Sequence, residues 1–173
     1  MIKVLVSSCL IGEPVRYHGG DARCVNEILD RWLAEGRLVP FCPETAAGLP
    51  VPREAAEIAG DGGAAVLRGD AFVGDRTGSD LTAAFVKGAR STLETAVAHG
   101  ARLAVLKDGS PSCGTSYIHD GSFRGQRGPG QGVTAAMLSS AGIRLFNEHQ
   151  LEEAAAYLEA LERGAPLRGS HED

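Results

Sequence analysis

The sequence predicts an α/β fold with a mainly parallel sheet of about four strands, flanked by helices and carrying small β-hairpin insertions. Two patterns predict this fold. Short segments that are apolar throughout, without polar alternation, are typical of parallel strands buried on both faces. Longer segments with apolar residues at helical spacing lie between them, and alternation of strands and helices is the signature of an α/β domain.

Four segments have the composition of buried strands, at residues 3–7 (KVLVS), 37–41 (RLVPF), 102–107 (RLAVLK) and 143–146 (IRLF). Pro40 in the second segment lacks the N–H that a central strand donates, so we expect this strand to lie at an edge or to end there. Four segments predict helices, at residues 25–35, 80–99, 133–140 and 148–162. In the longest, apolar residues recur every four positions from Leu81 to Val97.

Residues 43–78 interrupt this alternation. They include AAVLRGDAFVG, which predicts a hairpin that turns at Arg68-Gly69-Asp70. A second hairpin is expected in SYIHDGSF, with its turn at Asp120-Gly121. The pattern contains no linker and no repeat, so we expect one Rossmann-like domain over residues 1–163 and a flexible C-terminal tail over residues 164–173.

Composition and charge narrow the class of function. The 173 residues carry a net charge of −5 and no run of Lys or Arg, which argues against binding to DNA or to an anionic membrane. No apolar stretch approaches the ~18 residues of a membrane span, and the N-terminus lacks signal-peptide features, so we expect a cytoplasmic protein. In that reducing compartment the four cysteines are expected to be metal ligands, catalytic thiols or buried small side chains. The sequence does not indicate an oligomeric state.

Three of the cysteines follow predicted strands. Cys9 lies two residues beyond the first strand, Cys42 directly after the second, and Cys113 six residues after the third. Because the carboxyl ends of parallel strands share one edge of the sheet, where ligand sites form, we expect these three side chains to converge. Each also precedes helical structure, whose backbone N–H groups favour a thiolate.

Converging thiolates leave several chemistries open. Structural zinc sites usually use paired C-x-x-C ligands, which this sequence lacks, and a dithiol redox centre would leave the third cysteine unexplained. Thiolates in an enclosed pocket suit an iron–sulfur cluster, and three Cys ligands would leave one iron of a [4Fe–4S] cluster open to substrate. The simplest alternative is that these cysteines are buried apolar side chains, which is the interpretation adopted for Cys24.

Several spaced motifs resemble one bacterial family: SSCLIGEPVRYHG around Cys9, FCPETAAGLPVPREAAEI around Cys42, GSDLTAAFVKGA, and KDGSPSCG around Cys113. The resemblance runs from about residue 2 to residue 147, and DGSF and GQGVTAAML follow in the expected order. This family was long classed as a domain of unknown function, and its characterised members are iron–sulfur-dependent thiouracil desulfidases.

The resemblance implies a [4Fe–4S] cluster bound by Cys9, Cys42 and Cys113, with one open iron for the sulfur of a thionated pyrimidine, which water replaces to give uracil and sulfide. It also implies catalytic roles for Glu44 and Ser110. A carboxylate near the site can act as the base for water, and a hydroxyl can hydrogen-bond the substrate or relay a proton. The alternative function is a non-catalytic protein that binds a cluster or metal for sulfur handling or sensing. A third possibility is a zinc- or thiol-dependent α/β protein.

Weaker signals accompany these motifs. Arg16, Tyr17 and Arg53 follow the first two cysteine segments, and we expect them to bind the substrate because Arg and aromatic groups suit planar polar ligands. The loop GPGQG at residues 128–132 precedes a predicted helix. It lacks the Lys-Ser/Thr of a P-loop, so we expect it to shape the cavity wall rather than to bind a phosphate.

Overall fold

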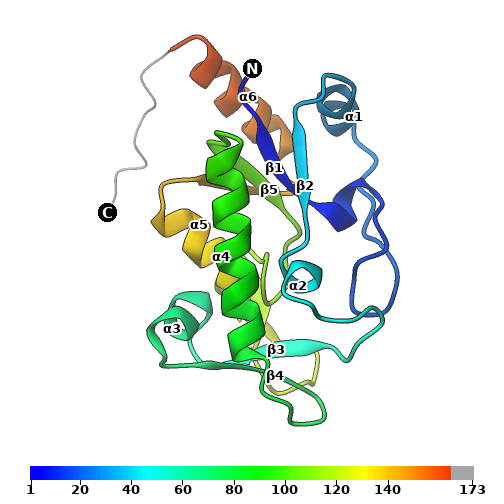
Figure 1. The fold of residues 1–173 in the computed structure, drawn as a ribbon, viewed down its shortest axis with the longest axis vertical. Helices are drawn as coiled ribbons and strands as arrows, with labels where there is room; N and C mark the ends of the chain where they lie inside the picture. The colour runs from blue at the N-terminus through cyan, green and yellow to red at the C-terminus, as the bar shows by residue number, and fades with distance from the viewer. Residues whose placement is uncertain (165–173) are drawn as a thin grey trace.

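A computed structural model describes residues 1–164 and confirms the α/β fold (Figure 1). The main sheet has four parallel strands in the order β2-β1-β5-β8. Their bounds are Val4–Ser7 for β1, Leu38–Phe41 for β2, Leu103–Leu106 for β5 and Arg144–Asn147 for β8. β2 is an edge strand, as Pro40 predicts. The predicted flexible tail lies, except for its first residue, outside the described residues, and the single-domain assignment stays a prediction.

Helices cover both faces of this sheet, which explains why its strands are apolar throughout. The flanking helices are α1 (Glu27–Ala34), α4 (Thr82–Ala98), α5 (Val133–Ser140) and α6 (Leu151–Glu162), close to the predicted ranges. Trp32 of α1 and Leu158 of α6 pack in one core with Val4 of β1. Leu5, the next residue of β1, packs in a second core with Leu138 of α5. Successive residues of the strand therefore enter opposite cores.

The hairpin predicted within residues 64–74 is wrong. Its first arm belongs to a helix, α3 (Gly63–Arg68), which ends at Gly69 with φ +84°. The strand that follows, β4 (Phe72–Asp75), pairs antiparallel with β3 (Ala56–Ala59) instead. A glycine in the left-handed conformation ends a helix as readily as it forms a hairpin turn, so the local pattern did not distinguish the two.

The second hairpin is also different from the one predicted. β6 (Tyr117–His119) pairs with β7 (Arg127–Pro129), so residues 120–126 form a loop and Asp120-Gly121 is not a tight turn. One carboxylate oxygen of Glu57 in β3 accepts hydrogen bonds from the backbone N–H groups of Gly121 and Phe123, at 2.9 and 3.2 Å. These two hydrogen bonds hold the loop against β3, and residues 121–123 do not pair as the second strand of a tight hairpin.

A single helical turn, α2 (Pro43–Ala46), follows β2 and carries Glu44. It packs so closely on α4 that a Cβ atom at Gly88 would lie 2.3 Å from the carbonyl oxygen of Pro43. Helix α2 was not among the four helices predicted from the sequence, although Pro43 at its first position and Glu44 in its first turn are usual signals of a helix start. The absence of a side chain at Gly88 sets how close α2 sits to α4.

The loop after β5 is organised by the buried carboxylate of Asp108, which is 4% exposed. Its Oδ1 accepts hydrogen bonds from the backbone N–H groups of Gly109, Thr115 and Ser116, at 3.0, 2.9 and 3.1 Å. Its Oδ2 accepts from the Ser116 hydroxyl and the Asn147 amide. Burial raises the pKa of this carboxyl, but the hydrogen bonds outweigh burial and hold the pKa below its usual value.

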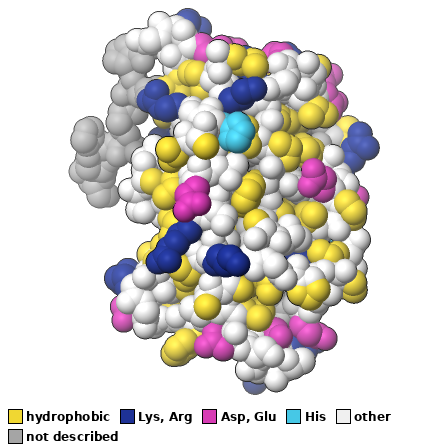
Figure 2. Space-filling view, viewed as in Figure 1, with side chains coloured by type: hydrophobic (Ala, Val, Ile, Leu, Met, Phe, Trp, Pro, Cys, Tyr) yellow, Lys and Arg dark blue, Asp and Glu magenta, His cyan; other side chains and the backbone are white. Residues whose placement is uncertain are grey.

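On the face that carries α4, acidic and basic side chains are interspersed and no basic patch gathers (Figure 2). None of the helices within residues 1–164 combines the length and the hydropathy that a bilayer span needs.

Replacing Gly88 with alanine tests the contact between α2 and α4. In an exposed helix interior this change stabilises by roughly 1 kcal/mol, but here the methyl group meets the Pro43 backbone. We expect Gly88→Ala to lower the free energy of unfolding by about 1–3 kcal/mol in urea denaturation. Glu94→Ala, exposed on the same helix, should change it by less than about 0.5 kcal/mol. Unchanged or increased stability of the Gly88 variant would contradict this packing.

Replacing Asp108 with asparagine tests the loop after β5. The asparagine amide would present N–H donors at a site where the loop's own N–H groups hydrogen-bond to carboxylate oxygens in the wild type. We expect a loss of about 2–4 kcal/mol in the free energy of unfolding. Since the pKa of Asp108 is lower in the folded state, its contribution is complete above about pH 5 and is lost as the pH falls below about 4.

Melting temperatures between pH 3 and pH 7 check both effects. Wild-type protein should lose stability on acidification more steeply than Asp108→Asn. The control is Asp120→Asn, because Asp120 accepts a hydrogen bond from the Ser122 backbone N–H in an exposed turn and asparagine can do the same. If Asp108→Asn proves as stable as this control, the loop does not depend on Asp108.

Candidate active site

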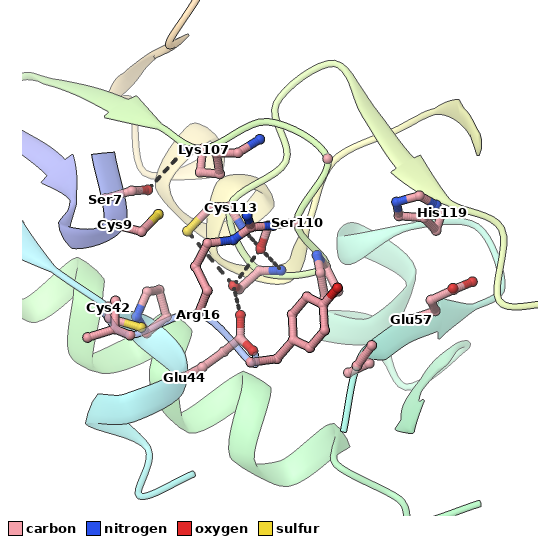
Figure 3. Close-up of a pocket in the computed structure, with 18 of the residues that line it drawn as sticks. Ser7, Cys9, Arg16, Cys42, Glu44, Glu57, Lys107, Ser110, Cys113 and His119 are labelled. Atoms are coloured by element: carbon pink, nitrogen blue, oxygen red, sulfur yellow. Dashed lines mark hydrogen bonds between the residues drawn. The ribbon is translucent and has the colours of Figure 1, made fainter. Parts of the chain in front are cut away.

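The carboxyl ends of β1, β2 and β5 open into a pocket of about 330 Å³. The chain runs from β1 to a neighbour on one side and later to β5 on the other, and such a switch point is where open parallel sheets place ligand sites. Cys9, Cys42 and Cys113 all line this pocket, as the strand-end argument predicts (Figure 3). None of the three is in a disulfide. Cys24 lies outside the pocket, half-buried and packed against the core that contains Trp32.

Each of the three cysteines is held by a different local structure. Cys9 lies in a 3-10 turn, η1 (Ser8–Ile11), Cys42 is the N-cap residue of α2, and Cys113 lies in the loop that Asp108 organises. Burial raises the pKa of Cys9 to about 11 and that of Cys113 to about 12, so both are neutral thiols at pH 7. For these two, burial outweighs the expected preference for thiolate, and a metal that binds them displaces their protons.

The donor set fits an iron–sulfur cluster better than a single metal ion. Cys9, Cys42 and Cys113 line the same pocket. Nevertheless, no three His, Cys, Asp or Glu side chains within residues 1–164 lie close enough together to hold one ion. In a [4Fe–4S] cluster each thiolate binds a different iron, so the ligands are more widely spaced than around one metal.

Glu44 projects from α2 into the same pocket, and its carboxylate is held from two sides. Oε1 accepts a hydrogen bond from Arg53 Nη2 at 3.1 Å, and Oε2 accepts one from the Ser112 hydroxyl at 2.8 Å. The side chains of Arg53 and Glu44 are only 8% and 15% exposed, so this ion pair is largely shielded from water. The carboxylate is therefore fixed in orientation next to the three thiols.

Ser110 lies between Asp108 and Cys113 and also lines the pocket. Its Oγ accepts hydrogen bonds from the backbone N–H groups of Ser112 and Cys113, both at 3.1 Å, and lies 3.0 Å from the Ser112 Oγ. Ser112 thus links Glu44 and Ser110, the two catalytic candidates, in one hydrogen-bonded group. Ser112 was not among the predicted site residues, and its place in the SPSC motif was the only signal for it.

The three residues expected to bind substrate have different surroundings. Arg16 and Tyr17 line the pocket, and the Arg16 guanidinium has no ion pair or hydrogen bond with another group in residues 1–164. Arg53 is occupied by the protein: besides Glu44, its guanidinium donates to the carbonyl oxygens of Pro50 and Val15, at 3.0 and 3.1 Å. Arg16 is free to meet a ligand, whereas Arg53 orients Glu44.

The other end of the pocket is lined by side chains that were not among the predicted site residues. Glu57 and His119 lie there, away from the cysteines (Figure 3). They come from β3 and β6, elements whose pairing was not predicted. No motif connects these two positions in the sequence, so only the fold brings them into the pocket.

The glycine-rich loop at residues 128–132 was expected to shape the cavity wall, but none of its residues lines the pocket, and Gly132 packs against the backbone of the Cys113 loop instead. A Cβ atom at Gly132 would lie 2.5 Å from the Ser112 backbone. The first N–H groups of α5, from Val133 and Ala135, donate to the carbonyl oxygens of Pro111 and Ser112, at 2.9 and 3.1 Å. They therefore hold the Cys113 loop in place instead of binding an anion.

Known proteins are similar to this chain in sequence and in fold. The family model described as 2-thiouracil desulfurase matches residues 4–150. YbbK of Bacillus subtilis (strain 168), an uncharacterized protein, is 41% identical over 150 residues, which cover 87% of this chain and 98% of that protein. The solved structure of TudS, a [4Fe-4S]-dependent thiouracil desulfidase, matches with a TM-score of 0.85 and 44% identity, covering 92% of this chain and 99% of that one. The chain belongs to the 2-thiouracil desulfurase family.

Proposed function

We propose that this protein is a [4Fe–4S]-dependent desulfidase that removes sulfur from thiouracil or a related thionated nucleobase, giving uracil and sulfide. Membership of the family and the likeness to TudS support the activity and the cluster. The structural observation that supports it most directly is the convergence of three free thiols and an oriented carboxylate in one pocket. A cytoplasmic location and the absence of a DNA partner stay predictions.

Cys9, Cys42 and Cys113 are the residues that would hold the cluster, one from the end of each of three neighbouring strands. Such a cluster would supply Lewis-acid chemistry, which would activate a thiocarbonyl group toward water. The protein contributes the other groups that the reaction needs: a base for water, a hydroxyl donor and a cation for the substrate.

Glu44 is the base that takes a proton from the attacking water. Arg53 and Ser112 each occupy one of its oxygens, and every carboxylate oxygen has a further lone pair to offer. Because the carboxylate is already oriented, little reorganisation is needed when the proton moves. Ser110 relays a proton: its Oγ already accepts two backbone N–H groups, and its single proton is the one it can pass on.

Arg16 binds the substrate through a ring carbonyl oxygen. Its guanidinium offers several N–H donors that the protein itself does not use, and it lines the same pocket as the thiols. Tyr17 lies next to it, with the Arg16 Cζ 5.9 Å from the centre of the Tyr17 ring. Tyr17 thereby presents an aromatic wall for a planar base.

Turnover of 2-thiouracil by protein reconstituted with iron and sulfide under anaerobic conditions tests this function. We expect uracil and sulfide as products and a fall in kcat of about 10²–10⁴-fold in Glu44→Gln, because the base is lost. The iron and sulfide content should stay as in the wild type. Glu54→Gln is the matched control, since Glu54 is exposed and lies outside the pocket.

Three outcomes would count against parts of this proposal. Nearly full activity of Glu44→Gln with an intact cluster would show that Glu44 is not the base. A wild-type protein that holds the cluster without turnover would favour the non-catalytic alternative. A colourless protein with zinc and no iron would contradict the cluster itself.

The two arginines should have separable effects on kinetics. Arg16→Gln removes a charged donor to the substrate and should raise KM about 10–100-fold with a smaller effect on kcat. Arg53→Gln removes one anchor of Glu44 and should lower kcat with KM nearly unchanged. Steady-state kinetics on both variants checks this assignment, and the reverse pattern would mean that Arg53 contacts the substrate.

A further inference from the structure

Ser112 lies at the centre of the polar contacts in the pocket, and its side chain is buried, with the residue 1% exposed. A serine hydroxyl has one proton, and a carboxylate has none to give. Ser112 therefore donates its proton to Glu44, whose Oε2 lies 2.8 Å away. In the 3.0 Å contact between the two hydroxyls, Ser110 must consequently be the donor and Ser112 the acceptor.

The competing partner of this hydroxyl is the Cys113 sulfur, at 3.8 Å. That contact is longer than the one to Glu44, and sulfur is a weak hydrogen-bond acceptor. The Ser112 hydroxyl therefore stays on Glu44. One side chain thus restrains Glu44 at Oε2 and gives the Ser110 proton an acceptor at the same time.

The backbone of Ser112 is held as firmly as its side chain. Its carbonyl oxygen accepts a hydrogen bond from Ala135 N at 3.1 Å, and its N–H donates to the Ser110 Oγ at 3.1 Å. Gly132 lies directly against it, with no room for a side chain between them. Ser112 is therefore a fixed point between α5 and α2, from which the orientation of Glu44 is set.

We propose that Ser112 is a positioning residue of the desulfidase reaction, which orients the Glu44 carboxylate and the Ser110 hydroxyl together. The inference rests on the proposed function. Without the Ser112 hydroxyl, Glu44 is held at Oε1 alone, by Arg53, and its free oxygen can turn away from the water. The Ser110 hydroxyl also loses the acceptor that directs it.

Ser112→Ala in the reconstituted protein should lower kcat about 10–100-fold and leave KM within about twofold, because orientation of the base is lost while substrate contacts remain. In the Glu44→Gln background the same substitution should cost less than about threefold, because the group that Ser112 orients is already disabled. Ser112→Thr, which keeps the hydroxyl, should restore most of the activity.

The matched control is Ser116→Ala, in the same loop, whose hydroxyl donates to Asp108 and does not reach Glu44. It should lower the melting temperature and leave kcat within about twofold. A Ser112→Ala protein with wild-type kcat would overturn the proposal. So would equal losses from Ser112→Ala in the wild-type and Glu44→Gln backgrounds, since additivity means that the two residues act independently.

A second readout does not depend on turnover. Melting temperatures of the reconstituted wild type, Ser112→Ala, Glu44→Gln and the double variant form a cycle that reports the contact itself. We expect the double variant to lose several degrees less than the sum of the two single losses. Additive losses of melting temperature would show that Ser112 and Glu44 do not interact, even if the wild type turns over thiouracil. Non-additive losses without wild-type turnover would overturn the proposed function and the catalytic role of Ser112, and leave the contact standing.

Discussion

The loop that carries Ser110, Ser112 and Cys113 contains neither helix nor strand, and its shape depends on the buried carboxylate of Asp108. Buried backbone N–H groups need acceptors, and a loop cannot supply them from a ladder of its own. Asp108 Oδ1 accepts hydrogen bonds from backbone N–H groups at both ends of the loop, those of Gly109 and Thr115, and so holds the two ends together. The Asp108 N–H in turn donates to Glu148 at 2.8 Å, which connects the loop to the residue that follows the neighbouring strand β8.

Much of the fold could be predicted from the sequence because both faces of the sheet are covered. That burial makes the strands apolar throughout, which is visible without a structure, and parallel strand ends place Cys9, Cys42 and Cys113 together. The failures have a different origin. The loop at residues 120–126 is set by Glu57, 64 positions from Gly121 in the chain, and no local pattern reports a contact at that distance.

The residues of the candidate site also divide into those that could be predicted from the sequence and those that could not. Glu44 and Ser110 could be named because they lie in motifs, close in sequence to the cysteines. Ser112 and Arg53 could not be assigned their places, since each acts through a contact with Glu44 that is visible only in three dimensions. Arg16 and Arg53 are the same residue type in similar segments, and only the structure shows that one has its donors engaged while the other does not.

The distribution of charge explains why the two arginines differ. A buried carboxylate without a partner is costly, so Glu44 needs a cation beside it, and Arg53 is that cation. Lys107 lies near Cys9 but is paired with Glu148 at 3.0 Å. Arg16 also lies near Cys9, and its charge lowers the pKa of that thiol against the larger effect of burial. Of the two cations that act on Cys9, Lys107 is committed to a carboxylate, so Arg16 is the one left to balance charge on that sulfur and to meet a neutral, planar ligand.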